Sequence, residues 1–319
     1  MAQQIRILND IMRVERKRYV SFGDFSVTDL ISPVRLVRLK KRYGETFEED
    51  PMAKVAALLG TFIHEGMEKR LSVAQYLDDR YILERSVNDV LRHGDKDFLI
   101  SGRFDVLYED EITDIKSCSV WKRIFDPEFT EWTQQQNIYA NLLQTRGVPV
   151  NALKILAIYK DWNSGLAMRD KDYPNEMIEE IELPLWDSTT TRILLESLFE
   201  KHVVHLNTPD EELPYCTEEE RWERFSGGHT VEYALFKKPK AARASKVLRG
   251  GGLVDAFRWI QQNSKGYTRD SIVEVRHAAR KRCDKYCGVA AKCNHYQEYL
   301  KKKGDNETLN EIHNLHQIL

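Results

Sequence analysis

The stretch Ser101–Cys118 reads SGRFDVLYEDEITDIKSC and alternates as two short strands around an acidic turn. Apolar residues at every second position of the first strand place Asp105 on the opposite face. In the second strand, Asp114 and Lys116 lie two residues apart and therefore point to the same side. Folded back as a hairpin about the turn Glu109–Glu111, the stretch brings the two aspartates together, with the lysine beside them.

Two carboxylates at this distance repel each other unless a cation lies between them. Mg²⁺ prefers oxygen ligands at about 2.1 Å, and a neighbouring lysine then steadies an attacking water or a phosphate oxygen. Asp105, Asp114 and Lys116 are thus an arrangement for metal-assisted phosphodiester hydrolysis. The alternative interpretation is an acidic hairpin with a surface salt bridge, because the pattern D-x-K is short and common.

Two predicted helices flank the hairpin in the sequence. The upstream helix, residues 52–74, carries His64, and Glu68 stands where the H-E-x-x-H pattern of zinc proteases needs a second histidine. A lone helical histidine is most often structural, but a neutral imidazole is also an acceptable ligand for Mn²⁺. In the downstream helix, residues 129–146, Gln135 and Tyr139 share one face.

His64, the G-x-x-D of Gly102–Asp105, the D-I-K of Asp114–Lys116 and the Q-x-x-x-Y of Gln135–Tyr139 follow one another in this order. The chain thereby resembles the PD-(D/E)XK nuclease superfamily, in particular its RecB-like exonuclease branch. That branch includes the nuclease domains of RecB and AddB and the CRISPR-associated RecB-like exonucleases. The resemblance implies an α/β fold with a restriction-endonuclease-like core, in which helices flank a mixed central sheet.

The resemblance also implies roles for individual residues. The ligands of a Mg²⁺ or Mn²⁺ ion would be His64, Asp105, Asp114 and the backbone carbonyl of Ile115. Lys116 would orient the water and stabilise the developing charge, while Gln135 and Tyr139 would contact the substrate backbone. Glu84, on a predicted strand at residues 80–88, matches a position where relatives often carry an acid. Its alternative interpretation is a charge on the strand surface.

Three of the five cysteines stand close together near the C-terminus, in the pattern C-x3-C-x5-C. With no visible signal peptide we expect an intracellular, cytoplasmic protein, so the cysteines indicate metal ligands before disulfides. The predicted ligand set is Cys216, Cys283, Cys287 and Cys293. Four thiolates suit a [4Fe–4S] cluster or tetrahedral Zn²⁺. The resemblance favours iron–sulfur, although the relatives have a shorter first gap and a distant N-terminal cysteine. His295 or His229 in place of Cys216 would favour zinc.

Composition restricts the remaining possibilities. The net charge of −2 is not that of a simple DNA-coating protein, and no apolar run approaches the ~20 residues that cross a bilayer. No Gly-Lys-Ser/Thr follows a glycine cluster, which excludes a helicase motor. The turn-rich Asn207–Asp210 predicts a boundary between a nuclease core, 1–206, and a cysteine-clasped extension, 207–319. The basic run from Lys237 to Lys246 indicates a solvated surface, with DNA contact as the minor alternative.

The predicted function is that of a divalent-metal-dependent DNA nuclease, an exonuclease acting on DNA ends or single strands in recombination, repair or replication. A sequence- or structure-specific endonuclease of the same superfamily is the first alternative. A non-catalytic DNA-binding recombination partner and a structural zinc or redox-sensing protein are the others. DNA is the expected partner, a recombination or replication protein is a further candidate, and no membrane is involved. Family-level analogy to compact exonucleases suggests a phage origin.

Overall fold

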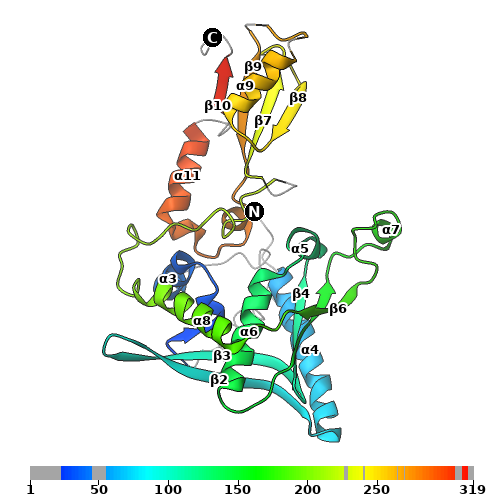
Figure 1. Cartoon of the computed structure of the whole chain (residues 1–319), viewed down its shortest axis with the longest axis vertical. Helices are drawn as coiled ribbons and strands as arrows, with labels where there is room; N and C mark the ends of the chain where they lie inside the picture. The colour runs from blue at the N-terminus through cyan, green and yellow to red at the C-terminus, as the bar shows by residue number, and fades with distance from the viewer. Residues whose placement is uncertain are drawn as a thin grey trace, which may run out of the picture. The chain divides into compact units, whose positions relative to one another are not determined.

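The computed structural model describes residues 23–44, 55–225, 229–239, 241–263, 265–268, 270–305 and 311–314. The chain forms two compact units (Figure 1). Unit 1 comprises Met1–Val37 and Glu48–Thr208, and unit 2 comprises Arg38–Phe47 and Pro209–Leu319. The expected division into 1–206 and 207–319 stays a prediction. Among the described residues, no helix combines the length and the apolar character needed to span a membrane.

Unit 1 is built on a six-stranded mixed sheet in the order β1-β3-β4-β5-β6, with β2 paired to β3. The strands are β1 (Phe25–Ser26), β2 (Tyr81–His93), β3 (Lys96–Tyr108), β4 (Glu111–Cys118), β5 (Ala152–Tyr159) and β6 (Ile178–Leu183). The predicted hairpin is confirmed as β3 and β4, which pair in antiparallel fashion. β4 then pairs in parallel with β5 along its whole length, which buries it in the middle of the sheet.

One edge of β3 is shared between two strands, and this positions the site. β2 pairs with the other edge along the length of β3. On the shared edge, β1 pairs only with Ile100 and Ser101, and β4 pairs only with Val106–Tyr108. The four residues between them, Gly102–Asp105, therefore have no strand neighbour on that edge. This gap is the G-x-x-D motif.

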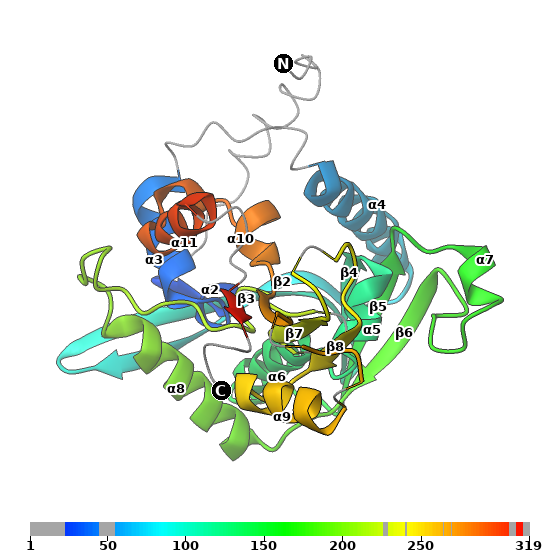
Figure 2. The same ribbon diagram turned by 90° about the horizontal axis from the view of Figure 1, so that it is seen from above.

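Helices cover both sides of this sheet. The helices of unit 1 are α2 (Val27–Leu30), α4 (Val55–Leu77), α5 (Val120–Phe125), α6 (Thr130–Gln144), α7 (Ser164–Ala167) and α8 (Ser188–Val203), while α3 (Val34–Tyr43) runs from unit 1 into unit 2. Figure 2 shows α4 on one side of β2 and β3 and α6 with α8 on the other. The predicted helices 52–74 and 129–146 correspond to α4 and α6, although residues 52–54 lie outside the described residues. The predicted mixed α/β core, with helices flanking a mixed sheet, is confirmed.

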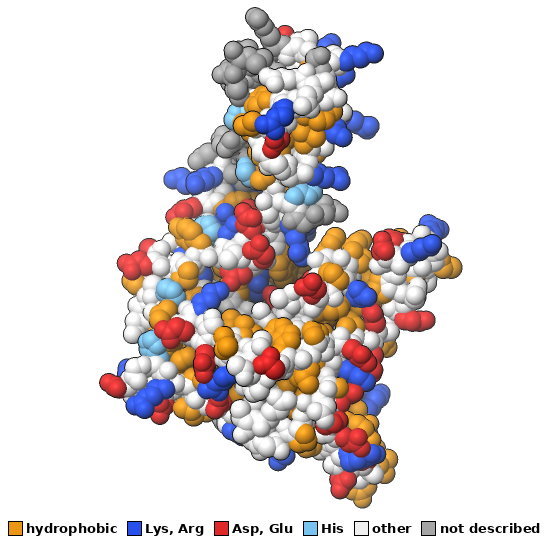
Figure 3. All heavy atoms as spheres, viewed as in Figure 1, with side chains coloured by type: hydrophobic (Ala, Val, Ile, Leu, Met, Phe, Trp, Pro, Cys, Tyr) orange, Lys and Arg blue, Asp and Glu red, His pale blue; other side chains and the backbone are white. Residues whose placement is uncertain are grey.

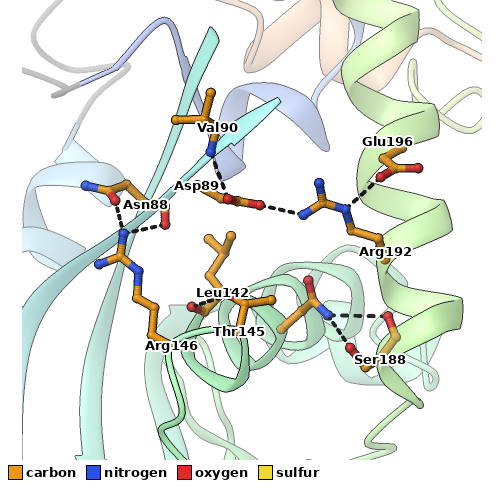
Figure 4. A network of polar contacts seen from close by, with 10 residues as sticks. Asn88, Asp89, Val90, Leu142, Thr145, Arg146, Ser188, Arg192 and Glu196 are labelled. Atoms are coloured by element: carbon orange, nitrogen blue, oxygen red, sulfur yellow. Dashed lines mark hydrogen bonds and ion pairs between the residues drawn. The ribbon is translucent and has the colours of Figure 1, made fainter. Parts of the chain in front are cut away.

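Helix α6 has ten buried residues, and polar contacts join it to its neighbours. Arg146, just after α6, donates to the backbone oxygen of Asn88 on β2 at 2.8 Å, and Arg192 on α8 lies 2.5 Å from Asp89 (Figure 4). Asn141 donates to the Ser188 hydroxyl at 2.8 Å. Strand β2 and helices α6 and α8 are thus held as one body.

Asn137 makes the connection between β6 and α8 part of this body. Its side-chain amide donates to the backbone oxygens of Thr133 and Pro184 at 2.9 Å, and its oxygen accepts from the Trp186 backbone N–H at 2.7 Å. Replacing the buried Asn137 by alanine should lower the free energy of unfolding by about 2 kcal/mol, because the Pro184 and Trp186 backbone groups lose their partners. Urea titration measures this, with Gln134→Ala in the same helix as the near-neutral control.

Unit 2 contains a smaller, four-stranded antiparallel sheet in the order β10-β9-β7-β8. Its elements are β7 (Val231–Phe236), β8 (Lys246–Arg249), α9 (Leu253–Gln262), β9 (Ile272–His277), α10 (Lys281–Lys285), the 3-10 helix η3 (Ala290–Lys292), α11 (Asn294–Asp305) and β10 (Glu311–Asn314). Buried Leu235 and Val273 pack with Ile260 of α9 in one core. The end of α3 also belongs to unit 2, where the Tyr43 hydroxyl donates to Asp210 at 2.6 Å.

Candidate functional site

Asp105 marks the point at which β3 and β4 separate. The last pair on this side joins Val106 to Thr113, so a continued register would place Asp105 opposite Asp114. Instead, the Asp105 carboxylate accepts a hydrogen bond from the backbone N–H of Ile115 at 2.8 Å. A side-chain acceptor replaces the carbonyl that a regular ladder would supply. The two aspartates therefore remain neighbours while the strands diverge around them.

Asp114 and Lys116 form a close pair on β4. The lysine Nζ lies 2.8 Å from one oxygen of Asp114, and the buried amide of Gln136 on α6 donates to the other oxygen at 2.9 Å. Burial raises the pKa of Asp114, against the opposing effect of Lys116. Burial, the largest single effect, lowers the pKa of Lys116, but the charge and hydrogen bond of Asp114 together with the charge of Asp105 leave the net pKa raised. The lysine is therefore a charged donor at neutral pH.

His64 lies between two carboxylates. Its Nε2 is 2.8 Å from Asp105 on β3, and its Nδ1 is 3.3 Å from Glu84 on β2. The hydrogen bond with Asp105 raises the pKa of His64. Burial, followed by the charge of Asp105, raises the pKa of Glu84 to about 7. This crowding of acids around one imidazole is the electrostatic signature of a site that favours a cation.

Glu84 reaches this position through an unusual backbone. Its φ angle of 49° lies in the left-handed region, in the middle of strand β2. The residues on either side pair regularly with Val106 and Phe104, so Glu84 falls opposite Asp105. Its second oxygen lies 2.5 Å from Arg103 Nε. Such a conformation costs about 1–3 kcal/mol in a residue with a side chain and is concentrated at functional sites.

Gln135 and Tyr139 meet each other rather than Asp114. The Gln135 amide donates to the Tyr139 hydroxyl at 2.9 Å, and the tyrosine ring lies against the backbone of Gly102. A Cβ atom added at Gly102 would lie 2.5 Å from the ring atom Cε1, so only glycine fits under this ring. Burial raises the pKa of Tyr139 to about 12, so the hydroxyl keeps its proton. Gln136, the next residue, makes the contact to the acid.

A pocket of about 360 Å³ opens between α4 and β4. Its lining residues are Gly60, Thr61, Ile63, His64, Glu65, Ile115, Lys116 and Ser117. An adjoining small hollow is lined in part by His64, Glu68, Glu84, Asp105 and Ile115. Four of the predicted site residues, His64, Asp105, Ile115 and Lys116, thus line two adjoining hollows, whereas Asp114, Gln135 and Tyr139 line neither.

The donor set suits a hard divalent cation, although its membership differs from the predicted one. His64, Glu68 and Glu84 each offer one ligand atom within 4.8 Å of the other two. Asp105 adds a carboxylate 2.8 Å from the same imidazole. Asp114 is paired with Lys116 and Gln136 instead. Imidazole and carboxylate groups together match the preferences of Mn²⁺ and, less closely, Mg²⁺.

The structure adds three residues that the predicted site did not include: Glu68, Glu84 and Gln136. Glu84 matches a position where the resembled relatives often carry an acid, but the sequence did not separate this role from that of a charge on the strand surface. Glu68 lies four residues after His64, on the same face of α4, which is a usable spacing signal. Ile115, predicted to offer its carbonyl, lines both hollows and binds Asp105 through its N–H.

The cysteines Cys216, Cys283, Cys287 and Cys293 gather in unit 2, all with free thiols. Burial, followed by the charge of Glu220 and then the neighbouring cysteines, raises the pKa of Cys216 to about 12. Burial, followed by Cys287 and Cys293, raises the pKa of Cys283 to about 11. A backbone hydrogen bond of 3.1 Å from Arg282 to Arg221 joins the two segments that carry them. Long-range pairing therefore returns Cys216 to the C-terminal trio.

No family model and no curated protein matches the chain. Among solved structures, the chain is similar to a protein described as SSO0001, with 21% identity, a TM-score of 0.46, and coverage of 69% of this chain and 96% of that one. It is also similar to an alkaline exonuclease (LHK-Exo) from Laribacter hongkongensis, with 10% identity, a TM-score of 0.31, and coverage of 57% and 88%. Both TM-scores lie below 0.5, so neither similarity assigns a function to the chain.

Proposed function

We propose that unit 1 is a divalent-metal-dependent nuclease that hydrolyses phosphodiester bonds of DNA, acting as an exonuclease on ends or single strands. The observation that carries this proposal is the convergence of a charged lysine, two aspartates and an imidazole–carboxylate cluster beside one open pocket. Together with the order of the motifs, this arrangement supports membership of the PD-(D/E)XK superfamily, and of its RecB-like branch.

The residues divide into two groups by what they do. His64, Glu68, Glu84 and Asp105 would hold the cation, with Asp114 alongside. When bound, a divalent ion supplies Lewis-acid polarisation of the phosphate and a more acidic water. Lys116, lining the pocket, donates to the attacking water or to a non-bridging phosphate oxygen and stabilises its developing negative charge.

Asp114 and Gln136 position the lysine rather than contact the substrate. One carboxylate oxygen fixes the Lys116 ammonium, and the amide of Gln136 holds the other oxygen from α6. The Gln135–Tyr139 pair, resting on Gly102, keeps α6 in register with β3. We infer that this pair orients the substrate backbone through the tyrosine hydroxyl.

A digestion assay tests the proposed function. Purified protein is incubated with 5′- and 3′-labelled single and double strands in Mg²⁺, in Mn²⁺ or in EDTA, and end-blocked circles serve as a further substrate. We expect cleavage of linear strands that needs the metal and leaves circles uncut. Cleavage of circles would replace the exonuclease by an endonuclease. Lack of cleavage of every substrate in both metals would refute a nuclease.

The cysteine quartet of unit 2 is proposed to hold a [4Fe–4S] cluster with a structural role. Four zinc-bound thiolates at 2.3 Å from the metal lie about 3.8 Å from one another. Among the described residues, no three of these thiols lie within 4.8 Å of one another. The proposal of a cluster, in which each thiolate binds a separate iron, is supported by the four-thiolate donor set and by the family resemblance of the sequence.

Anaerobically purified protein should therefore be brown, with absorption near about 400 nm, as expected of a cubane cluster. Cys283→Ser should lose this absorption and its iron by metal analysis, because one of the four ligands is removed. Cys118→Ser, a thiol of unit 1 outside the quartet, is the matched control and should keep both. Stoichiometric zinc without iron in the wild-type protein would overturn the cluster assignment.

A further inference from the structure

The positive charge of this chain is concentrated in one segment. The whole chain has a net charge of −2, yet residues 231–292 contain 15 Lys and Arg against 5 Asp and Glu, a net charge of +10. The rest of the chain is accordingly acidic. Figure 3 shows Lys and Arg side chains over the part of unit 2 that carries β8 and α9. The core of unit 2 is apolar, so the excess positive charge lies outside it.

The strongest concentration lies in the connection between β7 and β8. From Phe236 to Val254 the sequence has no acidic residue. All the described basic side chains from the end of β7 to the first residue of β8 are exposed. They are Lys237, Lys238, Arg243 and Lys246. In the part of the chain that the structure describes, none of these four forms an ion pair, whereas Arg249 at the end of β8 pairs with Glu232. We name these four residues the basic hairpin surface.

The basic hairpin surface is held in place by its own contacts. Ser245 donates from both its backbone N–H and its hydroxyl to the Leu235 oxygen at 2.8 Å, and the Ser271 hydroxyl donates to the Lys237 oxygen at 3.0 Å. The ammonium of Lys237 lies 5.5 Å from the centre of the Tyr267 ring. The ammonium of Lys246 lies 5.9 Å from the centre of the Trp259 ring. Side chains already ordered on aromatic rings lose little entropy when they bind an anion.

We propose that the basic hairpin surface binds the phosphate backbone of the nucleic acid on which unit 1 acts. The inference rests on the proposed function, which makes nucleic acid the polyanion that this chain meets. Four exposed cations without carboxylate partners match a chain of phosphates, whose condensed counterions are released on binding. Contacts of these cations to phosphates would carry no sequence information, so we expect binding that is independent of sequence.

Binding to a long fluorescent single strand tests the proposal by anisotropy over a range of salt concentrations. The full chain is used in the Lys116→Met background, so that the substrate is not cut. The test variant carries Lys237→Gln, Lys238→Gln, Arg243→Gln and Lys246→Gln. The control variant removes four exposed charges elsewhere, through Lys96→Gln, Lys171→Gln, Lys301→Gln and Lys302→Gln.

The test variant should bind about tenfold more weakly at about 0.1 M salt, and the slope of log K against log salt should fall by about three, since each lost phosphate contact removes about 0.7. The control variant should bind as the parent does. Equal affinity and slope in parent and test variant would overturn the proposal, while cleavage by the wild-type protein still supported the nuclease. Equally strong competition by polyglutamate would also overturn it, in favour of an acidic protein partner. A wild-type protein that neither binds nor cuts would refute the proposed function as well.

Discussion

Replacing Lys116 by methionine should reduce the rate of DNA cleavage by about 10³-fold, the usual effect of removing one donor to a developing negative charge. Methionine keeps an unbranched apolar stem that ends one atom short of the lysine nitrogen, and it has no ammonium group. The pocket would then lack the donor that lies 2.8 Å from Asp114. Single-turnover cleavage of a labelled single strand in Mg²⁺ measures the change.

Lys154→Met is the matched control. Lys154 lies on the neighbouring strand β5 and is also flanked by two carboxylates, Glu111 at 2.9 Å and Glu180 at 3.0 Å, but it does not line the pocket. Since Lys116→Met leaves Asp114 buried beside Gln136 alone, Asp114→Asn with Lys116→Met provides a variant without the unpaired charge. Both variants should be folded by circular dichroism and inactive. Undiminished cutting by Lys116→Met would falsify its catalytic role.

Among glycine-to-alanine changes in the described part of unit 1, Gly102→Ala should lower the free energy of unfolding the most. The new Cβ would lie 2.5 Å from Cε1 and 2.8 Å from Cδ1 of the Tyr139 ring, and 3.2 Å from Cγ2 of Val27. These neighbours are buried and belong to α6 and α2, so none of them can move without displacing a helix. Overpacking of this kind costs about 3 kcal/mol, which corresponds to a melting temperature lower by about 8 °C.

Cleavage should fall together with stability, because displacement of Tyr139 breaks its contact with Gln135. Gly66→Ala serves as the control. Its added Cβ would have Arg70 Nη1 as its nearest neighbour at 3.9 Å, and alanine in a helix is about 1 kcal/mol more favourable than glycine. A Gly102→Ala protein that melts and cuts like the parent would contradict the packing of Tyr139 on Gly102.

The hairpin and the two flanking helices were predictable because they depend on local periodicity. Alternation fixed the shared face of Asp114 and Lys116, which the structure places 2.8 Å apart. Gln136 was not predictable, since adjacent helical residues differ by about 100° in direction and only the position of α6 decides which glutamine reaches the acid. The family resemblance pointed to Glu84 as an acid, but its backbone conformation was hidden, because a left-handed residue within a strand has no sequence signal when it is not glycine.

The division of one edge of β3 between β1 and β4 could not be predicted from the sequence either. Whether β1 or β4 pairs with a given residue is a long-range outcome, decided by where α2 and α6 pack. The motif G-x-x-D marks the gap, but only the fold explains why its glycine and aspartate stand three residues apart. Gly102 makes room for the Tyr139 ring, and Asp105 lies just beyond the point where the pairing of β3 with β4 ends.

The assembly of unit 2 from two distant segments has a consequence for synthesis on the ribosome. Tyr43 binds Asp210, a residue that lies 167 positions later in the chain. At about 5–20 residues per second, translation needs roughly 8–33 s to deliver that partner. β1 precedes Tyr43, and the other five strands of the unit 1 sheet, β2 to β6, are synthesised within this interval. The nascent chain can therefore complete the sheet of unit 1 before the segment that contacts the end of α3 has been synthesised.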